Sequence, residues 1–240
     1  MHAVIARRTL NPVRLQASLY YDIGFHPLHS RKISSMLKLY DFLPSGNSYK
    51  VRLVLSQLHI PYERIDVDIL TGESRTPAFL AKNPNGRIPL LEIAPQVYLS
   101  ESNAIMCFLA RDSMLLPREP LHHAQVLQWL FFEQYSHEPY IATSRYWVAL
   151  LGQEREYRNE LAKKREPGYA ALKIMDQHLA AHDFFVANRY SLADIGLYAY
   201  THVAPEGGFE LDTFPNILTW LDRIRSQPDH IDIRHIPGQA

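Results

Sequence analysis

The sequence predicts an α/β domain followed by an all-α domain. Up to about residue 112, short runs of alternating apolar residues are separated by segments that have the apolar spacing of helices. After Pro117 and Pro120 the chain has no convincing strand pattern and keeps only helical spacing. Since 240 residues are enough for two small domains, we place the domain boundary in this proline-marked linker.

The first half opens with a strand–helix–strand unit. Residues 37–42 alternate between apolar and polar side chains, as a strand does, and residues 65–69 alternate again. Between them, apolar residues at 51, 54, 55 and 58 lie at i, i+3, i+4 and i+7, which is one face of a helix. Two strands joined by such a helix pair in parallel with a right-handed crossover.

The remaining elements of this half give it a recognisable order. A Thr-Pro pair at 76–77 starts a short helix, with proline in its favoured first turn. Residues 90–93 and 97–99 form strands around a tight turn, and a helix follows over 103–110. The order βαβ-α-ββ-α is that of a thioredoxin-like domain, which we place at residues 36–112.

The second half, residues 121–230, is predicted to be all-helical. Pro139 should kink or break its first helix, because proline lacks the backbone N–H that a helix interior needs. Ser191-Leu192-Ala193-Asp194 is a Ser-x-x-Asp variant of the capping box, and we interpret it as structural. The helical stretches run over residues 121–150, 154–182, 192–203 and 215–226.

Residues 1–35 differ from the rest of the chain. They are rich in arginine, contain a single acid, Asp22, and show no hydrophobic period. They also lack the apolar stretch of a secretory signal. Their composition fits an organelle transit peptide, but we favour a disordered or non-native extension, with Met36 as the start of the folded chain.

Composition excludes several classes of function. The formal net charge is +0, so the global charge predicts no nucleic-acid or anionic-membrane partner. No apolar run approaches the roughly 20 residues of a membrane helix. Cys107 is the only cysteine, which excludes an intrachain disulfide and a Cys-x-x-Cys centre and fits a reducing cytoplasm. His178 and His182 lie four apart on a helix but have no evident third ligand, so we predict no metal.

A loop in the first half carries the strongest functional signal. Residues 83–92 read Asn-Pro-Asn-Gly-Arg-Ile-Pro-Leu-Leu-Glu, a turn that ends in Ile88-Pro89 before a strand. The residue before a proline is pushed to extended backbone, which exposes the N–H and C=O of Ile88 to a neighbour. Glu101-Ser102 opens an apolar helix about a dozen residues later.

Together these residues resemble the glutathione site of the glutathione transferases. In that family a loop ending in cis-proline is followed by a strand hairpin and by a Glu-Ser or Gln-Ser pair at a helix start. The family also has a thioredoxin-like domain followed by a helical domain. The resemblance covers residues 36–230 and implies that glutathione is a co-substrate.

The resemblance implies that Ser45 activates glutathione. The phi, theta and zeta classes place their active serine six residues before a helix valine, as Ser45 stands before Val51. A hydroxyl that donates to the glutathione sulfur stabilises the reactive thiolate, and the positive end of the helix adds to this effect. The alternative is that Ser45 merely caps the helix. Asn47 and Ser48 are rivals, because related bacterial and fungal proteins use an asparagine in this loop.

The resemblance also assigns contacts to the glutathione peptide. Ser102 would bind the γ-glutamyl carboxylate, because a helix N-terminus is a natural anion site, and Glu101 would help hold this end. The main chain of Ile88, fixed by Pro89, would pair with the cysteinyl backbone like an added strand.

Basic side chains are expected at the glycyl end of glutathione. Arg75 would reach the glycyl carboxylate by charge-assisted hydrogen bonds. Ser74 stands where the phi class carries histidine, which weakens that contact. Arg87 would add a second positive contact, and its alternative is a solvated charge.

The aromatic stretch 131–140 belongs to the helix that lines the site of the electrophilic second substrate in the family. Most aromatic side chains in a helical domain pack in the core, which is the alternative for each residue here. The candidates for this electrophile site are Tyr135, Tyr140, Arg145, Tyr146 and Trp147.

The resemblance implies a cytoplasmic glutathione S-transferase that adds the thiolate to an electrophilic small molecule, as in detoxification, and that forms a homodimer. Glutathione-dependent peroxidase or isomerase activity uses the same site. The zeta isomerases carry Ser-Ser-Cys where this chain has Ser45-Gly46-Asn47, which argues against that subclass. A noncatalytic glutathione-binding or assembly module of the same fold is the alternative from another class.

Overall fold

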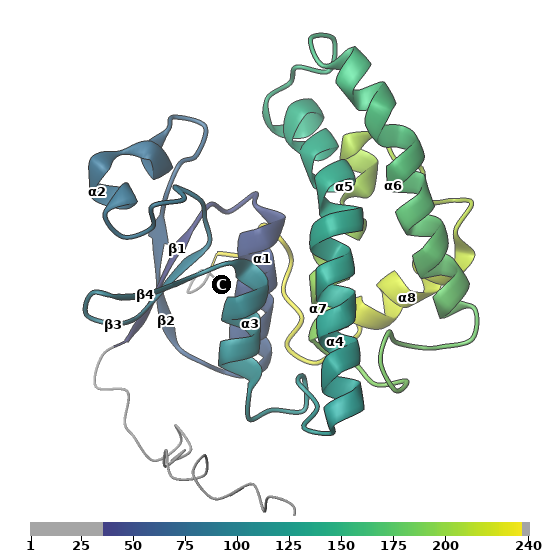
Figure 1. The fold of residues 1–240 in the computed structure, drawn as a ribbon, viewed down its shortest axis with the longest axis horizontal. Helices are drawn as coiled ribbons and strands as arrows, with labels where there is room; N and C mark the ends of the chain where they lie inside the picture. The colour runs from purple at the N-terminus through teal and green to yellow at the C-terminus, as the bar shows by residue number, and fades with distance from the viewer. Residues whose placement is uncertain (1–35, 237–240) are drawn as a thin grey trace, which may run out of the picture. The chain divides into compact units, whose positions relative to one another are not determined.

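The computed structural model describes residues 36–236, so the predictions for residues 1–35 lie outside the described residues. The described residues belong to one compact unit, Ser35–Ala240. A mixed sheet with its helices comes first in this unit and a helical half follows, which confirms the predicted fold class (Figure 1).

The sheet has the strand order β2-β1-β3-β4. β1 pairs in parallel with β2, which confirms the strand–helix–strand unit, and pairs antiparallel with β3, which in turn pairs antiparallel with β4. The second strand lies earlier than the predicted 65–69, because the residues that pair with β1 begin at Tyr62. The strands are β1 (Leu37–Asp41), β2 (Tyr62–Asp66), β3 (Leu90–Ala94) and β4 (Val97–Ser100).

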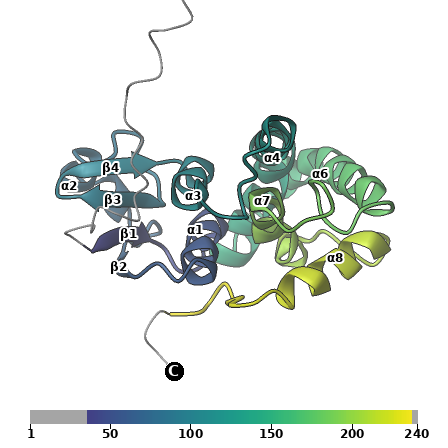
Figure 2. The same cartoon turned by 90° about the horizontal axis from the view of Figure 1, so that it is seen from below.

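Helices cover both faces of this sheet, as Figure 2 shows. One face carries a cluster that includes Leu39, Leu91 and Ile105, and the other a cluster of Leu90 and Phe79. Adjacent strand residues such as Leu90 and Leu91 therefore pack on opposite faces, as the two-residue period of a strand requires. The helices are α1 (Gly46–Gln57), η2 (Glu73–Arg75), α2 (Pro77–Leu80) and α3 (Ser102–Ala110).

The second half is helical, and Pro139 breaks its first helix as predicted. A π-helical turn, η3, separates α4 from α5, and Pro139 lies in the first turn of α5. Among the residues described, no helix has the length and apolar character needed to cross a membrane. The elements are α4 (Pro120–Phe132), η3 (Glu133–His137), α5 (Glu138–Arg145), η4 (Tyr146–Leu150), α6 (Arg158–Leu179), α7 (Leu192–Thr201), η5 (Ala204–Gly207) and α8 (Pro215–Arg225).

Helix α7 is buried along its whole length and begins with the predicted capping box. The backbone N–H of Ser191 donates to the Asp194 carboxylate at 2.9 Å, and the Ser191 hydroxyl donates to the same oxygen at 3.1 Å. Phe185 N and Trp220 Nε1 also donate to Asp194, at 3.2 and 3.0 Å. Burial nevertheless raises the pKa of Asp194 to about 6, against these hydrogen bonds.

Helix α1 packs between the sheet and α7, and a glycine permits the close approach at its first turn. A Cβ on Gly46 would lie 2.5 Å from the ring of Tyr200 in α7, so no larger residue fits there. On the outer side of α1, the chain after α8 runs back along the helix (Figure 2). Tyr49 donates to Ile231 O at 2.8 Å, and Arg52 donates to Ile233 O at 2.9 Å. The helical half therefore contacts α1 through α7 and through the chain that follows α8.

Candidate functional site

A cavity of about 450 Å³ lies where the start of α1, the loop before β3 and the helical half meet. From the helical half, Glu138, Thr143, Tyr146 and Tyr200 line it. The structure thus brings together residues that the sequence predicts to contact glutathione. The predicted residues that line the cavity are Ser45, Asn47, Ser74, Arg75, Arg87 and Ile88.

Ser45 caps α1 and keeps a donor for the cavity. Its Oγ accepts a hydrogen bond from Ser48 N at 3.2 Å, the usual bond of an N-cap serine. A hydroxyl also has one hydrogen to donate, so capping leaves the O–H free to act on a ligand. Ser45 can therefore cap α1 and donate a hydrogen bond to a ligand at the same time. Ser48 is fully buried and does not line the cavity, so the loop offers Ser45 and Asn47 as donors.

Asn47, in the first turn of α1, connects this helix to α3 and to the helical half. Its Nδ2 donates to Glu138 Oε1 at 2.9 Å, and its Oδ1 accepts from the Ser102 hydroxyl at 3.2 Å. Its backbone N–H donates to the Tyr200 hydroxyl at 3.2 Å. The Asn47 amide is therefore held in place beside a carboxyl group that faces the cavity.

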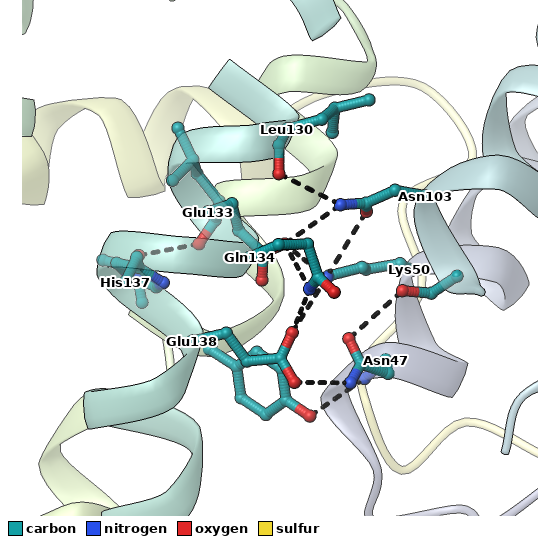
Figure 3. A network of polar contacts seen from close by, with 12 residues as sticks. Asn47, Lys50, Asn103, Leu130, Glu133, Gln134, His137 and Glu138 are labelled. Carbon is teal, nitrogen blue, oxygen red and sulfur yellow. Dashed lines mark hydrogen bonds and ion pairs between the residues drawn. The ribbon is translucent and has the colours of Figure 1, made fainter. Parts of the chain in front are cut away.

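Behind Asn47 lies a buried charged network (Figure 3). Lys50 and Glu133 form an ion pair at 2.8 Å, and both side chains are fully buried. Lys50 Nζ lies 4.0 Å from Glu138 Oε2, and the Gln134 amide donates to both glutamates. Burial raises the pKa of Glu138, with the nearby Lys50 opposing this effect.

The sequence did not predict this network. The available signal was a set of charged residues among apolar neighbours: Lys50 beside Val51 in α1, and Glu133 and Glu138 in the aromatic stretch. Charged side chains in such positions are rarely buried unless they are paired. Pairing them requires knowledge of which helices meet, and the helical pattern alone does not give it.

The basic residues that line the cavity are Arg75, in η2, and Arg87, in the loop before β3. The Arg75 guanidinium donates to Asn85 O at 3.0 Å, and Asn83 Nδ2 donates to Arg87 O at 2.7 Å. The peptide bond before Pro89 is cis, as the resemblance implied. The part of the cavity that η2 and this loop line is therefore basic.

Glu101 and Ser102 lie beside the cavity at the start of α3. Glu101 has φ 70°, a backbone conformation that L residues rarely adopt, and its side chain is exposed. Ser102 is buried and reaches the cavity through its bond to Asn47. Neither residue nor Pro89 is among the residues that line the cavity itself.

Of the candidates for the electrophile site, Tyr146 lines the cavity, and the other four are not among the residues that line it. Tyr135, in the π-helical turn η3, is 84% exposed. Tyr140 packs against Lys164, with Nζ 5.8 Å from its ring centroid, and Trp147 stacks on Tyr157.

Arg145 is not among the residues that line the cavity. It is buried, and its Nε pairs with Glu206 at 2.7 Å. Its Nη1 donates to Pro44 O at 2.7 Å, so it supports the loop that carries Ser45. Ala142 and Thr143 of α5 line the cavity in place of these candidates.

Among residues 36–236, no cluster of three or more histidine, cysteine or acidic side chains is arranged to hold a metal. Cys107 lies on α3 among core residues and does not line the cavity. Burial raises the pKa of its thiol, which disfavours the reactive thiolate. A thiol that reacts in this cavity must therefore come from a ligand.

Comparison with known proteins identifies the family. The family models for the N-terminal and C-terminal domains of glutathione S-transferase match residues 35–111 and 130–228. A solved glutathione S-transferase from Pseudomonas fluorescens Pf-5 is 51% identical, with 83% of this chain and 99% of that chain covered and a TM-score of 0.81.

Two more distant relatives are informative. The disulfide-bond oxidoreductase YfcG of Escherichia coli is 28% identical, over 80% of this chain and 92% of its own length. A glutathione transferase family member from Pseudomonas fluorescens Pf-5, solved with two glutathione bound, is 26% identical. That match covers 84% of this chain and 93% of the other, with a TM-score of 0.72. This chain belongs to the glutathione S-transferase family.

Proposed function

We propose that this protein is a glutathione transferase that holds glutathione in the cavity beside α1 and adds its thiolate to an electrophilic small molecule. The observation that carries the proposal is the convergence of Ser45, Asn47, Arg75 and Ile88 on one cavity. These residues come from separate segments of the chain, and the fold brings them together at the positive end of a helix.

Each part of the cavity has a role in this proposal. Ser45 donates to the sulfur, and Asn47 is the alternative donor. The main chain of Ile88 pairs with the cysteinyl backbone, next to Pro89. Ser102, with Glu101, holds the γ-glutamyl carboxylate. Arg75 and Arg87 hold the glycyl carboxylate, with Ser74 beside Arg75.

The second substrate faces the helical wall of the cavity. Ala142, Thr143 and Tyr146 form this wall, so it combines a methyl group, a hydroxyl and an aromatic ring. The sulfur attacks an electrophilic carbon, and the electron pair of the bond that breaks leaves with the displaced group or moves onto the rest of the substrate. An aryl halide is the simplest probe of this chemistry.

A second candidate is glutathione-dependent reduction of disulfides. It is favoured by the name of the Escherichia coli relative and by the two glutathione molecules in the Pseudomonas structure. Because Cys107 does not line the cavity, the attacking thiolate would be that of glutathione. It would attack one sulfur of the disulfide, form a mixed disulfide and release the other sulfur as a thiolate.

We further propose a cytoplasmic homodimer, as the family resemblance implies. Light scattering at micromolar concentration tests the assembly, and a monomeric mass would contradict it. A noncatalytic binding module is the remaining alternative, and it predicts glutathione binding without turnover on any substrate.

The test of this proposal is retention on immobilised glutathione followed by two turnover assays. One assay uses an aryl halide and the other a small mixed disulfide, each with glutathione. Ser102→Ala should weaken retention, whereas Glu166→Gln, an exposed change on α6, should not. A protein that is not retained and turns over neither substrate would overturn the proposed function.

A further inference from the structure

The buried network behind Asn47 carries more acid than base. Lys50 is the ammonium group that faces both Glu133 and Glu138. If all three groups are ionised, the cluster holds one negative charge without a partner. An unpaired charge in a protein interior is costly, so a carboxylate of this cluster accepts a proton more readily than a carboxylate in water does.

Glu138 is the carboxyl group that lies farther from Lys50. Glu133 takes the close position on Lys50, at 2.8 Å, and also accepts from Asn103 Nδ2 at 3.2 Å. Glu138 lies 4.0 Å from the same ammonium nitrogen. Its side chain is also 21% exposed, whereas Glu133 is fully buried, so Glu138 is the one that reaches the cavity.

The groups that face Glu138 come from α1, η3 and α7. Of the charged groups on the other elements packed against α5, Lys164 of α6 donates to Pro139 O at 2.7 Å, and Glu206 of η5 pairs with Arg145. Asn47 and Lys50 face it from α1, and Glu133 and Gln134 face it from η3. Tyr200 faces it from α7, and burial together with both glutamates raises the pKa of that phenol, which keeps it neutral. The positive charge that faces Glu138 is therefore that of Lys50, which already forms an ion pair with Glu133.

We propose that Glu138 accepts the thiol proton of glutathione when the thiolate forms, an inference that rests on the proposed function. The S–H bond breaks, its electron pair stays on sulfur, and the proton moves to the Glu138 carboxylate. The net charge of the site does not change in this step. Release of the proton to solvent would instead leave a thiolate and a carboxylate in one cavity, and two like charges this close oppose each other.

This transfer makes a specific prediction about pH. When a proton moves between two groups of the same complex, the fraction of thiolate does not depend on pH as long as the pair holds a single proton. When the proton leaves to solvent, the ratio of thiolate to thiol rises about tenfold per pH unit. Glu138→Gln keeps an acceptor oxygen for Asn47 Nδ2 but cannot take the proton.

The experiment uses the full-length protein and glutathione. Calorimetry in buffers of different ionisation enthalpy counts the protons released on binding, and ultraviolet absorbance measures the thiolate. For the wild type and for the exposed control Glu166→Gln, we expect a thiolate fraction that is nearly constant with pH and close to zero protons released per thiolate. For Glu138→Gln, we expect about one proton released per thiolate and an ordinary one-proton titration.

The wild-type measurement is decisive by itself, so the proposal remains testable should Glu138→Gln fail to fold. Release of one proton per thiolate by the wild type, with a one-proton titration of the thiolate, would overturn the role of Glu138 and leave the glutathione site intact. Absence of glutathione binding to the wild type would overturn the proposed function and this inference with it.

Discussion

Substitutions at Ser45 separate its two roles, because the structure gives it both a cap and a free donor. Ser45 Oγ accepts from Ser48 N at 3.2 Å, and alanine at this position loses both that bond and the hydroxyl donor. Loss of a serine cap to alanine costs about 0.5–2 kcal/mol of stability, but loss to glycine costs only a few tenths. Ser45→Gly therefore removes the donor with little loss of fold, and Ser45→Thr keeps both functions.

The catalytic effect follows from the strength of the lost bond. A hydrogen bond to a charged group contributes about 1.5–3 kcal/mol, so removing the donor should lower turnover at neutral pH by about 10- to 150-fold. The pKa of the bound thiol should rise by about one to two units and activity should recover as the pH increases. Glutathione affinity should change less, because Ser102, Ile88 and Arg75 still hold the peptide.

The assay is a pH–rate profile with an aryl halide, together with urea unfolding of each variant. An unchanged profile in Ser45→Gly would refute the assignment of the donor to Ser45. If Asn47→Ala then abolished turnover, the donor would be Asn47, and the glutathione site would stand.

Three further predictions concern the framework around the site. Asp194→Ala should lower the free energy of unfolding by more than the roughly 0.5–2 kcal/mol that loss of an exposed cap costs. The reason is that buried donors such as Trp220 Nε1 lose their acceptor. An unchanged urea midpoint would contradict this. Arg145→Ala should cost about 1–3 kcal/mol, since the carbonyl of Pro44 and Glu206 lose their partner; a midpoint equal to that of the wild type would show that this support is unimportant. Burial lowers the pKa of His202 to about 4, so the unfolded chain binds a proton that the folded chain rejects, and stability is lost as the pH falls from about 6.5 toward 4. In His202→Gln the pH dependence of urea unfolding over this range should be shallower by up to about 1.4 kcal/mol per pH unit, and an identical slope would contradict the assignment.

The sequence predicts the framework of this fold because the framework depends on local patterns. The alternation at 37–42, the helical spacing that ends at Leu58 and the capping box at Ser191 all describe contacts within one element or with the nearest layer. The second strand is placed less well, since its register is set by pairing with β1 and its apolar alternation continues past the paired residues.

The side of the cavity formed by the first half of the chain is predictable because it depends on backbone and motif. Ile88-Pro89 and Ser45 are positions whose role follows from their place in a loop or at a helix end. The helical side is less predictable, since the aromatic residues of this stretch do not reveal which of them face the first half of the chain. Tyr135 is exposed to solvent, whereas Tyr146 lines the cavity.

The partners in the charged network could not be predicted from the sequence either. Lys50 belongs to the first half of the chain and Glu133 and Glu138 to the second, and no local pattern indicates that these residues pair. Only the packing of α1 against the helical half shows that they are buried together.

The most direct test of the account is a crystal structure of the protein with glutathione. We expect one glutathione in the cavity beside α1, with its cysteinyl backbone alongside Ile88 and its γ-glutamyl carboxylate at Ser102. Its sulfur should lie within hydrogen-bond distance of Ser45 or Asn47, on the side of the cavity that Glu138 lines. Glutathione bound elsewhere, or an empty cavity in crystals soaked at millimolar glutathione, would contradict the account.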